Sequence, residues 1–84
     1  MYEVILYKDA VKFLKKIGKT KAEKVKKDLE NLKNWPKVKN IKKMYGEYDG
    51  YYRKRVGDIR IIFFVKNSQR KIYIDSINFR GSVY

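Results

Sequence analysis

The chain opens with a short apolar run followed by a segment of helical periodicity. Residues 2–7 (YEVILY) are rich in β-branched and aromatic side chains, which predicts a strand, and we expect this strand to lie inside a sheet. From Asp9 onward, apolar residues recur at positions i, i+3, i+4 and i+7, which is typical of one face of a helix. We expect this helix to be capped by the Asp9 side chain and to end at Gly18.

A second helical pattern follows after two residues. Thr20 and Glu23 have the spacing of a capping box, in which each side chain accepts a hydrogen bond from a backbone amide at the helix start. One apolar face then continues until Trp35 and Pro36 interrupt it. The short connection between the two helices predicts that they run antiparallel to each other.

The second half of the chain has the composition of strands. Residues 41–45 predict a short strand, and residues 51–56 and 59–65 predict two more, separated only by Gly57-Asp58, which favours a tight two-residue hairpin. Residues 71–79 predict a last strand. The expected fold is α+β, in the order β-α-α followed by a meander of three or four antiparallel strands, with the helices packed on the sheet. Since no linker or repeat divides it, we expect residues 1–84 to form a single domain.

The net charge of the 84 residues is +13, from 22 Lys and Arg against 9 Asp and Glu. Self-repulsion of this size destabilises a compact chain, so the charge indicates a polyanionic partner. Nucleic acid is the interpretation we favour, and an anionic membrane surface is the alternative. Much of the charge coats the two helices and is typical of a solvated face, although it also suits phosphate contacts: Lys12, Lys15, Lys16, Lys19, Lys21, Lys24, Lys26, Lys27 and Lys33.

Cysteine and histidine are both absent. Their absence removes the common metal ligands and the His-assisted nucleophiles, so we expect neither a metal nor a cofactor. The first 14 residues carry Glu3, Lys8, Asp9 and Lys12, which leaves no uncharged run for a signal or membrane-spanning segment. We therefore expect a cytoplasmic protein without a membrane partner.

The arginines are confined to the last part of the chain, because none precedes Arg53. If Gly57-Asp58 is the hairpin turn, Arg55 lies directly opposite Arg60, with Arg53 on the same face. Like charges placed across strands oppose folding, and a bound phosphate is the simplest compensation. We expect these residues and Arg80 to form an anion site, whereas Arg70, in a turn, is ordinary surface.

The aromatic residues admit two readings. Trp35, Phe13, Phe63, Phe64 and Tyr73 lie within or beside apolar runs and are expected in the core rather than in contact with nucleobases. Three tyrosines near the basic hairpin suit either role: Tyr48, Tyr51 and Tyr52.

Two motifs carry a resemblance to a known family. Residues 51–64 (YYRKRVGDIRIIFF) resemble the central hairpin of the RelE/ParE toxin superfamily, whose members often read Y-R-I-R-V-G-D-Y-R-V-I-Y there. Residues 79–84 (FRGSVY) are similar to the H-R-x-x-V-Y ending of its RelE branch, and the order of elements agrees over nearly the whole chain. The resemblance implies the toxin of a type II toxin-antitoxin system.

What the RelE resemblance implies is a metal-independent endoribonuclease that binds the ribosome, cuts mRNA in the A site and so inhibits translation. The toxin is expected to be a monomer that an antitoxin protein wraps and silences. The reaction is attack of a ribose 2′-OH on the adjacent phosphate, giving a 2′,3′-cyclic product. The residues that match the family's site are Arg53, Arg55, Arg60, Arg80 and Tyr84, and we expect further RNA contacts from Lys42, Lys43, Tyr51, Tyr52 and Lys54.

Because the chain has no histidine, Tyr84 is the candidate for the general base. A tyrosine with a pKa near 10 is only ~0.1 % ionised at pH 7, a penalty of roughly 4 kcal/mol that nearby guanidinium groups reduce. Arg80 is expected to assist the leaving group, while Arg53, Arg55 and Arg60 neutralise the phosphate. The position of Lys54 between two of these arginines predicts that it faces the helices instead.

Two other functions remain open at this point. A ParE-like toxin has the same fold and acts by binding DNA gyrase rather than by cutting RNA. A non-catalytic RNA-binding domain would use the lysine coat, and its arginines would be replaceable by lysine.

Overall fold

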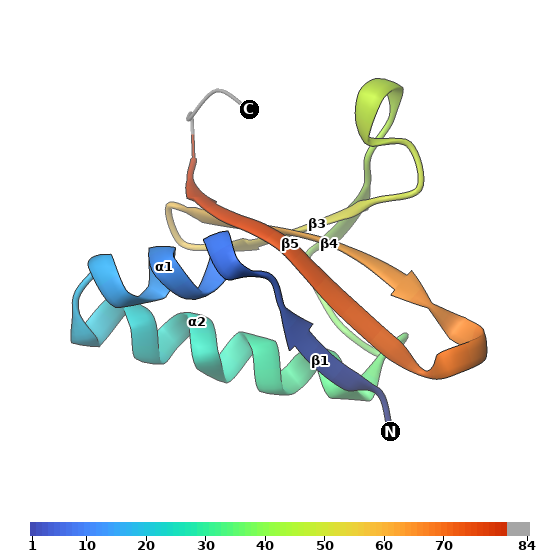
Figure 1. The fold of residues 1–84 in the computed structure, drawn as a ribbon, viewed down its shortest axis with the longest axis horizontal. Coiled ribbons are helices and arrows are strands. Elements are labelled where there is room, and N and C mark those ends of the chain that lie inside the picture. The colour runs from blue at the N-terminus through green and yellow to red at the C-terminus, as the bar shows by residue number, and fades with distance from the viewer. Residues whose placement is uncertain (81–84) are drawn as a thin grey trace.

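The computed structural model describes residues 1–80, which form two helices and a five-stranded sheet (Figure 1). In chain order, the helices and strands are β1 (Glu3–Leu6), α1 (Lys8–Lys16), α2 (Lys19–Asn31), β2 (Ile41–Lys43), β3 (Tyr52–Val56), β4 (Ile59–Lys66) and β5 (Lys71–Phe79). Three short 3₁₀ turns are η1 (Leu32–Asn34), η2 (Gly46–Tyr48) and η3 (Asn67–Gln69). The α+β class, the paired antiparallel helices and the hairpin between β3 and β4 agree with the sequence analysis (Figure 1).

The sheet has the order β1-β5-β4-β3-β2, in which β1 is parallel to β5 and every other neighbouring pair is antiparallel. The expectation that the first strand lies inside the sheet is therefore wrong, because β1 is an edge strand. An apolar run shows that a strand is partly covered but not whether it has a neighbour on both sides. Here the helices supply the cover for β1 (Figure 1).

Both predicted helix caps are wrong as well. Helix α1 begins at Lys8 directly after the sheet, with the Tyr7 carbonyl accepting the Val11 amide, and Asp9 forms no cap. Helix α2 begins at Lys19, since the left-handed backbone of Gly18 (φ 86°) turns the chain and its carbonyl accepts the Ala22 amide. The backbone geometry at Tyr7 and Gly18 therefore decides where the two helices begin, and no side chain caps the start of either helix.

The core lies between the helices and one face of the sheet. Its buried side chains come from both helices, from η1 and from the two longest strands: Ala10, Val25, Leu29, Leu32, Ile59, Ile61, Phe63, Ile72, Ile74 and Ile77. Within residues 1–80, no helix covers the opposite face, on whose side the η2 segment rises above the sheet (Figure 1). We call these two surfaces the closed face and the open face.

A β-bulge in β5 matches its sequence to the closed face. Ile62 of β4 pairs with Ser76, but the next residue, Phe63, pairs with Ile74, so Asp75 is an extra residue in β5. Without it, Ile74 and Ile77 would point to opposite faces, because side chains alternate along a strand. With it, both are buried in the core.

Within residues 1–80, no helix is long and apolar enough to cross a membrane.

Candidate anion site on the open face

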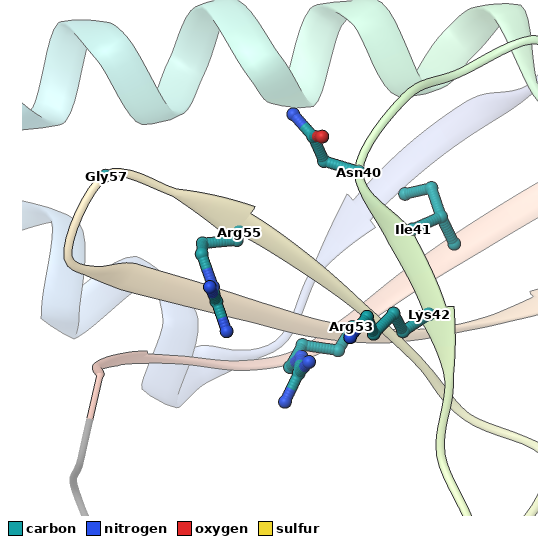
Figure 2. Close-up of a pocket in the computed structure, with 6 residues that line it drawn as sticks. All are labelled: Asn40, Ile41, Lys42, Arg53, Arg55 and Gly57. Atoms are coloured by element: carbon teal, nitrogen blue, oxygen red, sulfur yellow. The ribbon is translucent and has the colours of Figure 1, made fainter.

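The two central strands bring three arginines together on the open face. Arg55 of β3 lies opposite Arg60 of β4, as predicted, and Arg60 in turn lies opposite Asn78 of β5. Arg53 follows two residues earlier on β3 and lies opposite Lys42 of β2. Figure 2 shows Arg53 and Arg55 extending away from helix α2 on the same side of the sheet.

Arg80 joins this group through the backbone. Its amide donates a hydrogen bond to the carbonyl of Asp58, in the hairpin turn beside Arg55. The pKa of Arg55 is lowered from its ordinary value, first by the positive charge of Arg80, then by desolvation, and then by Arg53 and Arg60. The other three guanidinium groups predicted for the anion site therefore all act on that of Arg55.

Next to the arginines is a groove of about 430 Å³, lined by Asn40, Ile41, Lys42, Arg53, Arg55 and Gly57 (Figure 2). It forms where β2 begins only at Ile41, opposite Lys54, while β3 continues to Val56, so the last part of β3 has no β2 residue beside it on that edge. The groove is thus an open, cationic notch at the edge of the sheet. It suits a strand of phosphates better than an enclosed small molecule.

Three of the residues expected to contact RNA lie elsewhere. Lys54 points to the closed face, where it is only 5 % exposed, and its ammonium group donates to the Lys39 carbonyl at 2.9 Å. Tyr52 is on the same side, with its ring 4.9 Å from Trp35 and stacked on Phe63. Lys43 is exposed but lies opposite Tyr52 in the register, away from the arginines. We therefore leave these three out of the site.

The remaining predicted residues fall into two groups. Lys42 and Tyr51 belong to the same surface as the arginines, Lys42 beside Arg53 and Tyr51 with its ring 5.3 Å from Phe64. Tyr84 lies outside the described residues.

Sequence reasoning missed Asn78 and Asn40. Asn78 lies opposite Arg60, and Asn40, with a φ of 63°, lines the groove at the start of β2. The two-residue alternation of β5 could have placed Asn78 on the open face. Nothing in the local sequence distinguishes Asn40 from an ordinary connector residue.

Chemically, this arrangement binds and neutralises anions. Guanidinium groups stay protonated at physiological pH and present planar pairs of donors, which match a phosphate or a pentavalent phosphorane. Among residues 1–80, no three carboxylates are grouped so that they could hold a metal ion. The positive charge that lines the groove comes from Arg53, Arg55 and Lys42.

Solved structures of similar fold come from several organisms. The toxin-antitoxin complex RelBE2 from Mycobacterium tuberculosis matches with a TM-score of 0.84 and 20% identity, over 94% of this chain and 98% of that one. The RelE-RelB complex from Pyrococcus horikoshii matches with a TM-score of 0.80 and 28% identity, over 98% of both chains. Isolated RelE toxin from E. coli matches with a TM-score of 0.79 and 20% identity, over 99% of this chain and 88% of that one.

A comparison with curated protein sequences found no match. The family model described as the ParE toxin of type II toxin-antitoxin systems matches residues 4–84, which is nearly the whole chain. With the fold shared with RelE structures, this match confirms the RelE/ParE assignment made from the hairpin and the tail. The chain belongs to the ParE toxin family and is the toxin of a type II toxin-antitoxin system.

Proposed function

We propose that this toxin is a ribosome-dependent endoribonuclease that cuts mRNA in the A site. The observation that carries the proposal is the cross-strand pair of Arg55 and Arg60, with Arg53 and Arg80 beside it. Like charges placed across strands oppose folding, and an anion bound between them offsets this repulsion. A phosphodiester that gains negative charge as it reacts is the ligand that benefits most from them.

The proposed reaction is attack of a ribose 2′-oxygen on the adjacent phosphorus, with release of the 5′-oxygen of the next nucleotide. The 2′-hydroxyl loses its proton, the new P–O bond closes a 2′,3′-cyclic phosphate, and the leaving 5′-oxygen takes up a proton. Arg53, Arg55 and Arg60 neutralise the equatorial oxygens of the phosphorane. We assign to Arg80, whose backbone amide is bonded to the hairpin turn, the role of stabilising the leaving oxygen.

The general base comes from sequence reasoning alone. Arginine is a poor proton acceptor at physiological pH, and the chain has no histidine. We assign the role to Tyr84, whose phenolate form nearby guanidinium groups would favour. The assignment predicts that Tyr84→Phe slows cleavage while RNA binding is kept.

The open shape of the site suits a reaction that depends on the ribosome. The groove beside the arginines is open, and residues 1–80 offer no deep cleft in which an mRNA could be oriented. A ribosome that presents the mRNA in one geometry would supply this orientation, which is a large part of the barrier in such reactions. The proposal therefore places the protein in the cytoplasm, with the ribosome and mRNA as its partners.

We also propose that a RelB-like antitoxin binds this chain. Several solved structures of similar fold are toxin-antitoxin complexes, including that from Pyrococcus horikoshii. A net charge of +13 favours a partner rich in acidic residues, because opposite charge increases the rate of association and lowers self-repulsion. The complex with the antitoxin would be a hetero-oligomer, and the free toxin a monomer.

The test adds the purified protein to ribosomes programmed with a defined mRNA and maps the new 3′ ends. We expect cleavage within the A-site codon by the unmodified chain and a loss of about 10²–10³-fold for Arg55→Ala, as for removal of a donor to a developing oxyanion. Arg55→Lys keeps the charge but loses the planar fork, so its cleavage should lie between the two.

The matched control is Arg70→Gln, because Arg70 lies in the turn before β5, far along the strand from Arg80. It should cleave at the unmodified rate. No cleavage by the unmodified chain would sink the nuclease proposal. Cleavage that is unchanged in Arg55→Ala and Arg80→Ala would leave a nuclease with its site elsewhere.

The family model favours a second candidate, because it describes a ParE toxin. A toxin of that kind would bind DNA gyrase and cut no RNA. Inhibition of gyrase supercoiling by the unmodified chain, together with intact mRNA in the ribosome assay, would select this alternative.

A further inference from the structure

Aromatic rings gather at the end of the open face away from the hairpin turn. The rings of Phe64 and Tyr73 are stacked with their centroids 5.1 Å apart, and Tyr51 meets Phe64 edge-on at 5.3 Å. Tyr7 lies 6.0 Å from Tyr73 and 6.3 Å from Phe64. We call Tyr7, Tyr51, Phe64 and Tyr73 the ring platform.

The ring platform is separate from the core. Phe64 and Tyr73 were expected in the core, but neither belongs to the buried cluster under the helices, and this expectation is wrong. Alternation along β4 explains the error, because Phe63 is fully buried on the closed face and its neighbour Phe64 must therefore point to the open one. Tyr7 is 41% exposed, and the other three rings are half-buried.

The ring platform continues directly from the anion site. Tyr51 precedes Arg53 by two residues, about 7 Å along a strand, and Arg53 precedes Arg55 by the same step. On the open side of β4, Arg60, Ile62 and Phe64 follow one another at steps of two residues. A chain that lies on the arginines and continues along β3 therefore reaches the rings next.

Cations also lie beyond the rings. The Lys66 ammonium group is 5.7 Å from the centre of the Phe64 ring, and Lys66 pairs with Lys71 across the strands. The ring platform is thus bordered by positive charge on both sides along the strands. Such an arrangement fits a ligand with flat apolar groups on a backbone of repeated negative charges.

The Tyr51 phenol stays uncharged at neutral pH. The pKa of Tyr51 is raised, first by burial, then by the nearby carboxylate of Asp75, and then by Tyr7 and Tyr48. A neutral phenol avoids repulsion of a phosphate and keeps the ring available for stacking. The carboxylate of Asp75, the bulged residue of β5, therefore favours the neutral form of the Tyr51 phenol.

We propose that the ring platform stacks a base of single-stranded RNA beside the phosphate that Arg53 and Arg55 hold. This proposal deepens the proposed nuclease function and rests on it. Stacking on aromatic rings contributes about 1–3 kcal/mol per base and tolerates any base, since every base has a flat face. The rings would thus set the position of the strand, while the arginines act on the phosphate.

The test measures binding in the absence of ribosomes. Two single strands of equal length and charge are compared by fluorescence anisotropy: an RNA whose 2′-O-methyl groups prevent cleavage, and an abasic strand. For the unmodified chain we expect the base-bearing strand to bind about five- to one-hundred-fold more tightly, the range expected for a single stacked base.

Variants locate the effect. Tyr51→Leu and Tyr7→Leu should each bring the ratio of the two affinities toward one, whereas Tyr51→Phe, which keeps the ring, should preserve it. The matched control is Tyr45→Leu, because the Tyr45 side chain is 77% exposed outside the ring platform. Arg53→Ala should weaken both strands alike and leave the ratio unchanged. Thermal unfolding of each variant confirms that the comparison is between folded chains.

If the unmodified chain binds the two strands with equal affinity, the proposal that the ring platform stacks a base is wrong, even if the ribosome assay shows cleavage. An equal loss of the ratio in Tyr45→Leu would also overturn it. If substitutions in the ring platform weaken only the binding of a protein partner and leave the ratio of the two strand affinities unchanged, RNA is not the ligand of the platform. A ratio that depends on the rings in a chain that cuts no mRNA would support base stacking and reject the nuclease function instead.

Discussion

The two faces of the sheet are built from the same strands but have opposite character. On the closed face, β4 and β5 contribute aliphatic side chains and Phe63, nearly all fully buried under the helices. On the open face, the same strands contribute Arg60, Asn78 and the half-buried rings of Phe64 and Tyr73. Alternation along each strand separates these two sets, so stability and binding can change independently.

Each face has one residue that does not match its character. Lys54 is the only buried charged residue on the described part of the chain, and it lies on the closed face. Ile62 lies on the open face between Arg60 and Phe64, is fully buried, and does not belong to the core cluster. Lys54 secures the Lys39 carbonyl in the loop before β2, which lines the groove beside the arginines. The closed face therefore also supports the shape of the open one.

The largest change in stability should come from Phe63, and the neighbouring ring of Phe64 on the opposite face offers the comparison. Phe63→Ala should lower the free energy of unfolding by about 3–5 kcal/mol, because it leaves a cavity against Trp35 and Tyr52. Phe64→Ala, on the open face, should cost clearly less. Urea unfolding of both variants measures the difference, and equal losses would break the distinction between the faces.

A smaller effect is expected at Lys54. Lys54→Ala should lower the free energy of unfolding by about 1–3 kcal/mol, since the Lys39 carbonyl loses its buried donor. Lys54→Met keeps the packing of the stem and should lose less. Cleavage by Lys54→Met, if the nuclease proposal holds, should stay close to that of the unmodified chain. If stable Lys54→Met loses as much cleavage activity as Arg55→Ala, Lys54 belongs to the site.

At Arg55, on the open face, a substitution is expected to increase stability rather than to lower it. Arg55→Ala should raise the Tm, because it removes a charge repelled by Arg80, Arg53 and Arg60. The gain should shrink as salt is added, since the screening length falls from ~10 Å at 0.1 M to ~3 Å at 1 M. A lower Tm at every salt concentration would mean that Arg55 contributes to stability rather than to binding.

The smallest effect concerns alkaline pH. The pKa of Tyr51 is raised in the folded chain, so the folded state holds this proton more tightly than the unfolded state does. The resulting stability is present below pH 10 and is lost as the pH rises through the raised pKa. Unfolding between pH 8 and 11 should therefore show a steeper loss for the unmodified chain than for Tyr51→Phe. If stability falls with pH equally in the two chains, the fold does not hold the Tyr51 proton more tightly than the unfolded state does.

The hairpin shows what could be predicted for the site. A two-residue turn leaves a single register, so Gly57-Asp58 was enough to place Arg55 opposite Arg60 and Lys54 on the other side. The helix starts could not be predicted in this way. Asp9 and Thr20 have suitable side chains, but the entry from β1 and the turn at Gly18 begin each helix earlier.

Local patterns were enough to predict the helices and strands and the arginine pair, because alternation and tight turns are local properties of the chain. The hairpin and tail motifs were enough to recognise the family. Only the tertiary structure placed β1 at the edge of the sheet, since pairing with β5 joins residues about 70 positions apart. It also decided that Asp75 is the bulged residue and that Phe64 and Tyr73 share the open face with the arginines. These features depend on which strands become neighbours, and no local pattern contains that information.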